Sequence, residues 1–450
     1  MISRRGFLKG SAVLGGMAFG GLTAFQHLAH AQVHPDAPDR YYVFCYFNGG
    51  WDILLGLDPR DPQLFNNSNF RSTLIQPGYE QLQSGDGQLR RARDGEMFGP
   101  HIGGLLGHYD AGRISVMRGM SMDTLTHEVG RRRFLTGKPP AGLQARGSNG
   151  ATWLAAHLGQ GEPIPNLSLR VESYNKDQPN YATALGVNSV ADLLRALRPQ
   201  EPLLPAAAAR QVGQHLADAA SCPPARRSAF WQAAEQARRK AGDMVGSRLD
   251  GLFDFDARTP QMDEIRQHFG FARADTSPEV QAAFAAQAIT GGVSRCVSIE
   301  VASGLDTHFD EWERDQGPRQ ERGFNAVGRL IDRLQALEYR GTGTSWLDHT
   351  TLIGFSEFSR TALLNDRGGR DHSLTGACFI GGGGVRGGRV VGRSSDVGLS
   401  PQKVDLATGL PSAEGEIIRP EHVLRTLLEE VGLGDAPDLR VAPVPALMRG

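Results

Sequence analysis

The sequence contains few cysteines. Its 450 residues include only Cys45, Cys222, Cys296 and Cys378, which are widely spaced. This number and spacing exclude a disulfide scaffold and a zinc site built from thiolates. Three of the four lie within apolar runs of strand length, a context typical of buried free thiols.

The sequence also lacks an excess of charge of either sign. The formal net charge is −1, and basic residues occur in short clusters among acids, such as residues 131–133 and 238–240. Such clusters are typical of solvated helix faces and do not form the extended basic stripe that binds nucleic acid. We therefore expect no nucleic-acid partner.

Several familiar enzyme motifs are missing. The sequence has no Gly-x-Ser-x-Gly elbow, no His-Glu-x-x-His and no phosphate-binding loop. Gly382, Gly384 and Gly387 match Gly-x-Gly-x-x-Gly, but the strand-like residues 389–391 follow where a dinucleotide-binding motif requires a helix. This order predicts a Gly-rich hairpin.

Long apolar runs are absent as well. Residues 10–24 are apolar but rich in glycine, and they are shorter than the ~20 residues that a spanning helix needs. Arg4 and Arg5 precede this run and Ala29-His30-Ala31 follows it, which favours a twin-arginine export signal over a membrane anchor. We predict that residues 1–31 are a signal peptide for the twin-arginine translocase. Residues 32–450 would then form a single periplasmic or secreted domain without a stable membrane anchor.

Acidic and histidine residues follow four strand-like apolar runs. Residues 41–47 precede Asp52, residues 114–117 precede Asp123 and His127, residues 295–301 precede Asp306 and His308, and residues 350–355 precede Glu357, with Asp371 and His372 further on. In α/β proteins, ligands bind at the carboxyl ends of the strands. The pattern therefore predicts an α/β fold with an active or metal site at one edge of its sheet. Asp348 and His349 lie at the other end of their strand and are expected outside the site.

The individual signals differ in strength. Asp52 follows two glycines, so it fits a turn cap as well as a ligand. Asp306 and His308 suit one transition metal ion, because carboxylate and imidazole are ligands of zinc, manganese and iron. Thr126 precedes a predicted helix over residues 128–135, where a hydroxyl is either an N-cap or an anion-binding nucleophile.

Residues 187–292 differ from the rest of the chain in composition. They are rich in alanine, arginine and glutamine, and Phe230, Ala234, Ala237, Ala241 and Val245 recur at helical spacing. We predict a helical insertion or cap on the main sheet.

These residues together resemble the exported bacterial family of unknown function DUF1501. The resemblance is carried by the twin-arginine leader, Gly49-Gly50-Trp51-Asp52, Thr126-His127, Asp306-Thr307-His308, Ser356-Glu357-Phe358-Ser359-Arg360-Thr361 with Asn365, and Asp371-His372. That family is similar to the alkaline phosphatase and sulfatase superfamily. The resemblance implies a three-layer α/β/α fold with a large mixed, mostly parallel sheet.

The resemblance also implies roles for single residues. Asp52, Asp306, His308, Glu357 and His372 match metal-ligand positions, and Thr126 or Thr124 matches the hydroxyl nucleophile. Phe358 stands where the phosphatases have a metal-binding histidine, so a single ion, or a pair rebuilt with Asp371 or His127, replaces their two-zinc site. Arg360 or Arg131 would steady the developing charge.

Two functions are therefore expected from the sequence. The first is an exported hydrolase of phosphate or sulfate esters, small-molecule or polysaccharide, that uses one or two divalent ions of zinc, manganese or calcium. The second is a non-catalytic envelope protein that keeps the fold for binding or assembly.

Overall fold

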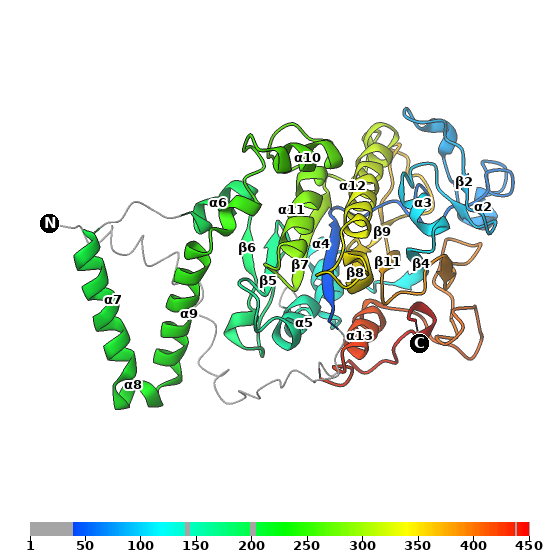
Figure 1. Ribbon diagram of the computed structural model, residues 1–450. Coiled ribbons are helices and arrows are strands. Elements are labelled where there is room, and N and C mark those ends of the chain that lie inside the picture. Colours follow the sequence, from blue (N-terminus) through cyan, green and yellow to red (C-terminus); the bar gives the residue numbers. More distant parts are fainter. Residues whose placement is uncertain (1–38, 140–144, 199–203, 437–438, 450) are drawn as a thin grey trace.

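A mixed eight-stranded sheet lies at the centre of the protein, in the strand order β12-β4-β11-β8-β1-β7-β5-β6 (Figure 1). The computed structural model describes residues 39–139, 145–198, 204–436 and 439–449. The predicted signal peptide and its cleavage site lie outside these residues. The strands of the sheet are β1 (Tyr41–Phe47), β4 (Ile114–Ser121), β5 (Asn166–Leu169), β6 (Leu185–Val187), β7 (Cys296–Ala302), β8 (Thr350–Phe355), β11 (Thr375–Gly382) and β12 (Arg389–Val391).

Most neighbouring strands of the sheet are parallel. β11 runs antiparallel to both of its neighbours, β4 and β8, and the remaining pairs are parallel. As a result, β1, β4, β7 and β8 all point the same way, and their carboxyl ends meet at one edge. The predicted α/β class with a large, mostly parallel sheet is confirmed.

The central strand β1 shows why the sheet is covered on both faces. All seven of its residues are buried. Val43, Cys45 and Phe47 belong to one hydrophobic core, whereas Tyr42 and Phe44, which point the other way, belong to a second core. A strand that is apolar on both faces needs a helical layer on each side. Cys45, Cys296 and Cys378 are buried free thiols, as predicted.

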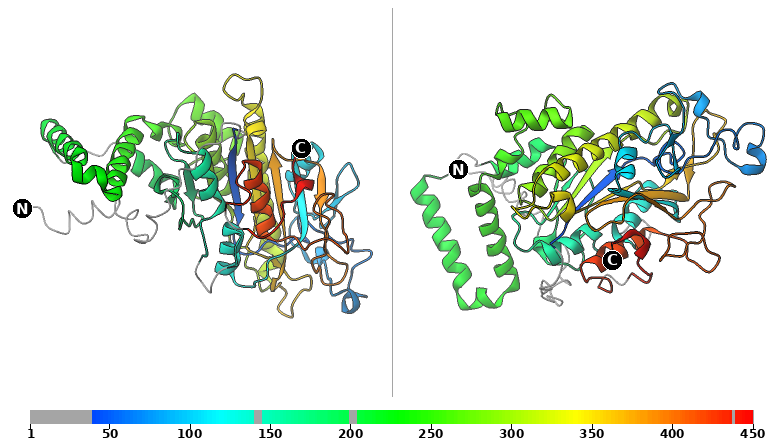
Figure 2. Two further views of the ribbon diagram at one scale, coloured as in Figure 1. Left: turned by 90° about the horizontal axis from the view of Figure 1, so that it is seen from below. Right: turned by 45° about the vertical axis from the view of Figure 1, so that its right-hand side comes forward.

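Helices form these two layers (Figures 1 and 2). On one face, α11 packs on β7 and on α12, with α10 and α3 beside α12; on the other face, α5 packs on β7 and β5, next to α4 and α13. The bounds are α3 (Leu105–Asp110), α4 (His127–Thr136), α5 (Gly150–Leu158), α6 (Val190–Leu197), α7 (Ala206–Ser221), α8 (Pro223–Arg227), α9 (Ala229–Gly246), α10 (Pro260–Phe269), α11 (Pro278–Thr290), α12 (Gly317–Ala336) and α13 (Pro420–Glu430).

The helical segment predicted over residues 187–292 has two parts. α7, α8 and α9 pack on one another and stand away from the sheet in all three views (Figures 1 and 2). α11 instead has ten buried residues and belongs to the helical layer on β7. Within the described part of this segment, α7–α9 project as an addition to the body.

The Gly-rich segment after β11 differs from its prediction. β12 pairs with β4 and not with β11, so the predicted hairpin is wrong. A Cβ on Gly387 would lie 2.0 Å from the carbonyl oxygen of Gly112. Only glycine allows this close approach, with which the chain crosses to the far side of β4. In the described ranges, no helix is long and apolar enough to cross a membrane.

Candidate metal centre

The site lies at the carboxyl-terminal edge of the sheet, where four loops meet. Asp306 and His308 follow β7, Glu357 follows β8, and His127 begins α4 after β4. His372 lies in β10 (His372–Ser373), which pairs with β9 (Ser359–Arg360). The parallel strands thus bring together side chains that are distant in sequence.

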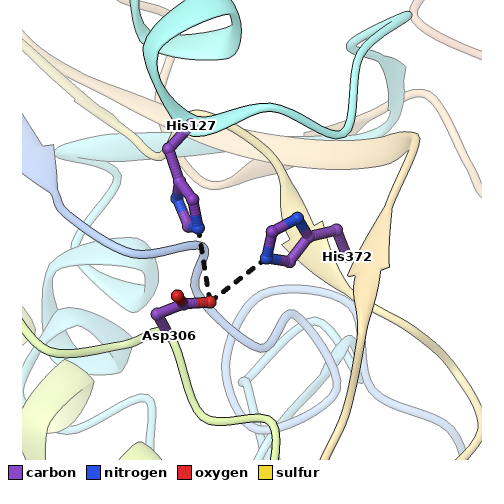
Figure 3. Close-up of side chains that lie close together, drawn as sticks. All are labelled: His127, Asp306 and His372. Atoms are coloured by element: carbon purple, nitrogen blue, oxygen red, sulfur yellow. Dashed lines mark hydrogen bonds and ion pairs between the residues drawn. The ribbon is translucent and has the colours of Figure 1, made fainter.

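Three imidazoles point at one carboxylate oxygen. The Oδ1 atom of Asp306 lies 3.3 Å from Nε2 of His127, 3.0 Å from Nε2 of His308 and 3.1 Å from Nε2 of His372. Figure 3 shows His127 and His372 directed at Asp306 from different elements. Ligand atoms of His127, Asp306 and His372 all lie within 4.8 Å of one another. This spacing suits a single bound cation.

The other nitrogen of each ring is fixed by an oxygen. Nδ1 of His127 lies 2.7 Å from Glu357, Nδ1 of His308 lies 2.9 Å from Asp371, and Nδ1 of His372 lies 2.6 Å from the Leu125 carbonyl. A carbonyl or an ionised carboxylate only accepts, so each Nδ1 carries the hydrogen. In the neutral rings, Nε2 then presents a lone pair to the cluster. Metal-binding histidines are oriented in this way.

The Nε2 lone pairs are incompletely satisfied. Nε2 of His127 is buried without a hydrogen-bond partner. Nε2 of His308 and of His372 are only 2.9 Å apart. Two neutral acceptors at this distance repel each other unless a proton or a cation lies between them. The donor set therefore fits a metal ion that is ligated by His127, His372 and Asp306 and bordered by His308.

Glu357 supports the site through its hydrogen bond with His127. Its side chain is fully buried, and it accepts hydrogen bonds from the Gly49 amide and the Ser356 hydroxyl, each at 2.9 Å. Burial acts to raise the pKa of Glu357, but the hydrogen bonds from His127, the backbone and Ser356, together with the charge of His127, outweigh it and the pKa is lowered. Burial likewise acts to lower the pKa of His127, which Glu357 reverses, so that this pKa is raised. Glu357, predicted as a ligand, orients His127 instead.

Arg360 holds the carboxylate of Asp306. Its guanidinium is buried, donates to Asp306 Oδ1 at 2.6 Å and to the Gly50 carbonyl at 3.0 Å, and approaches His308 Nε2 at 3.4 Å. Burial acts to raise the pKa of Asp306, but the hydrogen bond and charge of Arg360, together with His372 and His127, keep it well below its usual range. Asp306 is therefore ionised at every physiological pH.

The charge of the cluster favours a divalent cation. Asp306, Glu357 and Asp371 contribute three carboxylates, and Arg360 contributes one guanidinium. With neutral imidazoles these four groups sum to two negative charges. Arg367, which is half exposed, pairs with Asp371 at 3.3 Å and offsets one of them, so a net negative charge remains at the cluster. Carboxylates gathered in this way are stabilised by a cation.

Asp52 is not brought to this cluster. Its carboxylate is buried and is occupied by Arg370 at 2.9 Å, the Trp312 indole at 2.8 Å and the Leu54 amide at 2.9 Å. These partners account for both oxygens without an ion. The turn after β1 instead contributes the Gly49 amide to Glu357.

The predicted nucleophiles lie at the start of α4. Thr126 is exposed at the N-cap position and its side chain makes no capping hydrogen bond. The Thr124 hydroxyl accepts from the Thr126 amide at 3.2 Å. Among the described contacts, neither hydroxyl bonds to the cluster. Arg131 pairs with Glu172 and not with a cluster residue.

Sequence reasoning missed three supports of the site. The Leu125 carbonyl orients His372, the Gly49 amide binds Glu357, and Arg370 is buried beneath the cluster. Backbone groups carry no sequence signal, and Arg370 resembles any loop arginine. Asp348 and His349 lie in the 3-10 helix η6 (Trp346–His349) at the amino end of β8, as predicted.

Comparison with known proteins leaves the activity open but establishes the family. No curated protein matches the sequence. A model of a family described as protein of unknown function (DUF1501) matches residues 43–407, which run from β1 past β12 and include every residue of the cluster. Because the match spans most of the chain, the protein belongs to the DUF1501 family.

Proposed function

We propose that this protein is a metal-dependent hydrolase of phosphate or sulfate esters. One observation carries the proposal: three imidazoles have Nδ1 bound to fixed acceptors and direct Nε2 at one ionised carboxylate. The resemblance to the alkaline phosphatase and sulfatase superfamily, whose sites lie at the strand ends of a mixed sheet, supports the ester class. It also supports an alkaline phosphatase-like fold.

The donor set selects the ion. Imidazole nitrogen with one carboxylate oxygen suits zinc or manganese, whereas calcium prefers ligand sets made of oxygen. His127, His372 and Asp306 would hold one such ion, with His308 at its border. The ion would supply Lewis-acid polarisation of the ester oxygen.

The surrounding residues have separate tasks. Glu357 and Asp371 hold the imidazoles of His127 and His308 in the tautomer that exposes Nε2. Arg360 keeps Asp306 ionised, so its role is in the site and not on the substrate. The Thr126 hydroxyl, at the positive end of α4, is the proposed nucleophile, because free amides and the helix dipole favour an anion there.

Elemental analysis of protein purified without chelators tests the metal site. We expect about one zinc or manganese ion per chain. His372→Ala should lose most of it, while His349→Ala, at the other end of β8, should retain it. Metal-free wild-type protein that takes up neither zinc nor manganese on addition would refute the proposal.

A substrate panel tests the chemistry. Aryl phosphate, phosphodiester and aryl sulfate substrates with added zinc or manganese should show turnover, which Thr126→Ala abolishes and Thr124→Ala preserves. Turnover that persists in Thr126→Ala would assign the nucleophile to another group.

A non-catalytic role has one observation in its favour. The Phe358 ring lies 4.7 Å from the His127 ring and 4.3 Å from the His372 ring, between centroids. It thus covers the ligands with an apolar wall in the place where the phosphatases carry a metal-binding histidine. Metal binding without turnover on any substrate would support an envelope binding or assembly protein.

We also propose export to the periplasm by the twin-arginine translocase, on the strength of Arg4 and Arg5 ahead of a short apolar run. Replacing both arginines by lysine should leave the precursor inside the cell, as cell fractionation and immunoblotting would show. Normal export of this double variant would contradict the assignment.

A further inference from the structure

A buried ion pair lies beneath the cluster and joins the turn after β1 to the loop that carries His372. Arg370 Nε lies 2.9 Å from Asp52 Oδ2, and both side chains are almost completely excluded from solvent. The Trp312 indole donates to the same oxygen at 2.8 Å, and its ring lies 4.7 Å from the guanidinium carbon. A buried charge pair is retained only when such additional bonds complete it.

The hydrogen bonds of the Arg370 guanidinium come from its two terminal nitrogens. It donates to the carbonyls of Thr361 at 2.9 Å, Gln76 at 2.7 Å and Pro77 at 2.7 Å. One side chain therefore holds two separate segments, residues 76–77 and Thr361, at fixed positions relative to Asp52. Arginine suits this task because its planar donors have fixed directions.

The backbone of Arg370 connects this ion pair to the cluster. Its amide donates to the Thr307 carbonyl at 3.2 Å, and Thr307 separates Asp306 from His308. Asp371 and His372 follow Arg370 directly in the chain. A shift of Arg370 would therefore move residues on both sides of the His308–His372 contact.

The π-helix Trp312–Gln316 also contacts the loop that follows β7. It begins with the indole that binds Asp52, and it ends with Gln316, whose amide group lies 2.7 Å from the Thr307 hydroxyl. A π-helical turn is an unusual geometry that often occurs at functional sites. Here one end of the π-helical turn binds Asp52 and the other end binds Thr307.

We infer that Asp52 is a positioning residue: through its ion pair with Arg370 it sets the placement of His308, Asp371 and His372. This inference rests on the proposed metal site. It assigns Asp52, which has the sequence context of a ligand, to the support beneath the ligands. The pair acts through segments that Arg370 connects, so removing the charge of Asp52 should alter the cluster without removing any ligand.

The cobalt-loaded protein provides the first test, because the visible absorption of Co²⁺ reports the geometry of its ligands. Asp52→Asn keeps the shape and one acceptor oxygen but removes the charge that faces Arg370. We expect Co²⁺ affinity to fall about 10–100-fold, as when support of a metal ligand is lost, with a changed visible spectrum. Asp58→Asn is the matched control, because Asp58 is also buried and pairs with Arg60 at 2.9 Å. This control should lower thermal stability while leaving the affinity and spectrum unchanged.

A second readout needs no metal. Imidazole nitrogen NMR signals of His308 and His372 in metal-free protein report their hydrogen bonding, and they should shift in Asp52→Asn but not in Asp58→Asn. Trp312→Phe, which removes one hydrogen bond to Asp52, should shift them less and in the same direction, and it serves if Asp52→Asn does not fold.

The outcomes separate the two proposals. Wild-type affinity, spectrum and imidazole signals in Asp52→Asn would overturn the positioning role while leaving the metal site intact. Failure of wild-type protein to bind Co²⁺ would overturn the metal site, and the NMR comparison would then decide the positioning role by itself.

Discussion

Among single residues, Gly130 sets how closely α4 approaches the end of β8. A Cβ at this position would lie 2.4 Å from the Glu357 carbonyl oxygen and 3.1 Å from the Glu357 Cβ. Gly130 follows His127 by less than one helical turn. The absence of a side chain therefore allows the contact between His127 and Glu357 that orients the imidazole.

Gly130→Ala should consequently behave unlike most substitutions of glycine by alanine in helices. Alanine is ordinarily better in a helix interior by roughly 0.5–1 kcal/mol. Here we expect a loss of about 1–3 kcal/mol, as for overpacking of a tight contact, together with reduced metal content. Chemical unfolding and elemental analysis measure both effects.

Gly213→Ala is the matched control. Gly213 lies in α7, and a Cβ there would meet nothing within 4 Å. This variant should gain roughly 0.5–1 kcal/mol from helix propensity alone. Equal effects of the two substitutions would contradict the role assigned to Gly130.

Among the helices, α13 has a histidine, His422, that caps its first turn. His422 is buried, its Nδ1 accepts from the Arg419 amide at 3.1 Å, and its Nε2 faces Glu416 at 3.4 Å. Burial lowers the pKa of His422. A lowered pKa in the folded state means that unfolded chains bind the proton first, so stability is present above the ordinary pKa of about 6.5 and is lost as the pH falls.

This linkage predicts a measurable difference between variants. Between about pH 8 and about pH 5, the free energy of unfolding should fall less in His422→Asn than in the wild type, because asparagine keeps an acceptor but does not titrate. His215→Asn, at an exposed position of α7, should follow the wild type. Identical pH profiles for His422→Asn and the wild type would exclude His422 as a source of the acid lability.

The hairpin formed by α7, α8 and α9 is less well packed than the sheet. Phe230 and Trp231 are 61% and 47% exposed, so the hairpin buries little of its own apolar surface. α7 and α8 contribute no residue to either hydrophobic core. The hairpin therefore packs weakly on the body, and we expect the body to fold without it.

Replacing residues 206–241 by a short glycine and serine linker should leave the body folded. We expect unchanged metal content and a melting temperature close to that of the full chain, measured by calorimetry. Phe284→Ala in the buried helix α11 provides the contrast, with an expected loss of about 3–5 kcal/mol. A collapse of the melting transition in the linker variant would show that the hairpin supports the sheet.

For the whole molecule, a bound ion would couple several loops to the sheet at once. The cluster draws side chains from the segments after β4, β7 and β8 and from β10. An ion that binds only the folded chain stabilises it by about 2.7 kcal/mol at 100 times its dissociation constant. With an unfolding entropy of roughly 2.1 cal/mol/K per residue over roughly 400 residues, this corresponds to about 3 °C.

Chelation should therefore lower the melting temperature by about this amount, and added zinc should restore it. Asp306→Asn should melt at the same temperature with and without chelator. A chelator effect of the same size in Asp306→Asn and the wild type would place the responsible ion elsewhere.

The sequence by itself determined the elements and the end of the sheet that carries the site. Apolar runs of strand length predicted β1, β4, β7 and β8, because burial on both faces demands continuous hydrophobicity. The residues that follow these runs placed Asp306, His308 and Glu357 at one edge. The carboxyl ends of parallel strands all lie at the same edge of a sheet.

The tertiary structure alone decided which partner each group finds. Asp52 and Asp306 both follow buried strands, but Asp52 is neutralised by Arg370 and Asp306 joins three imidazoles. β12 pairs with β4 rather than with its neighbour in sequence, β11. Hydrophobic periodicity is a local property that sequence displays directly. Ion pairing and strand pairing depend on distances between segments far apart in the chain, and only folding sets those distances.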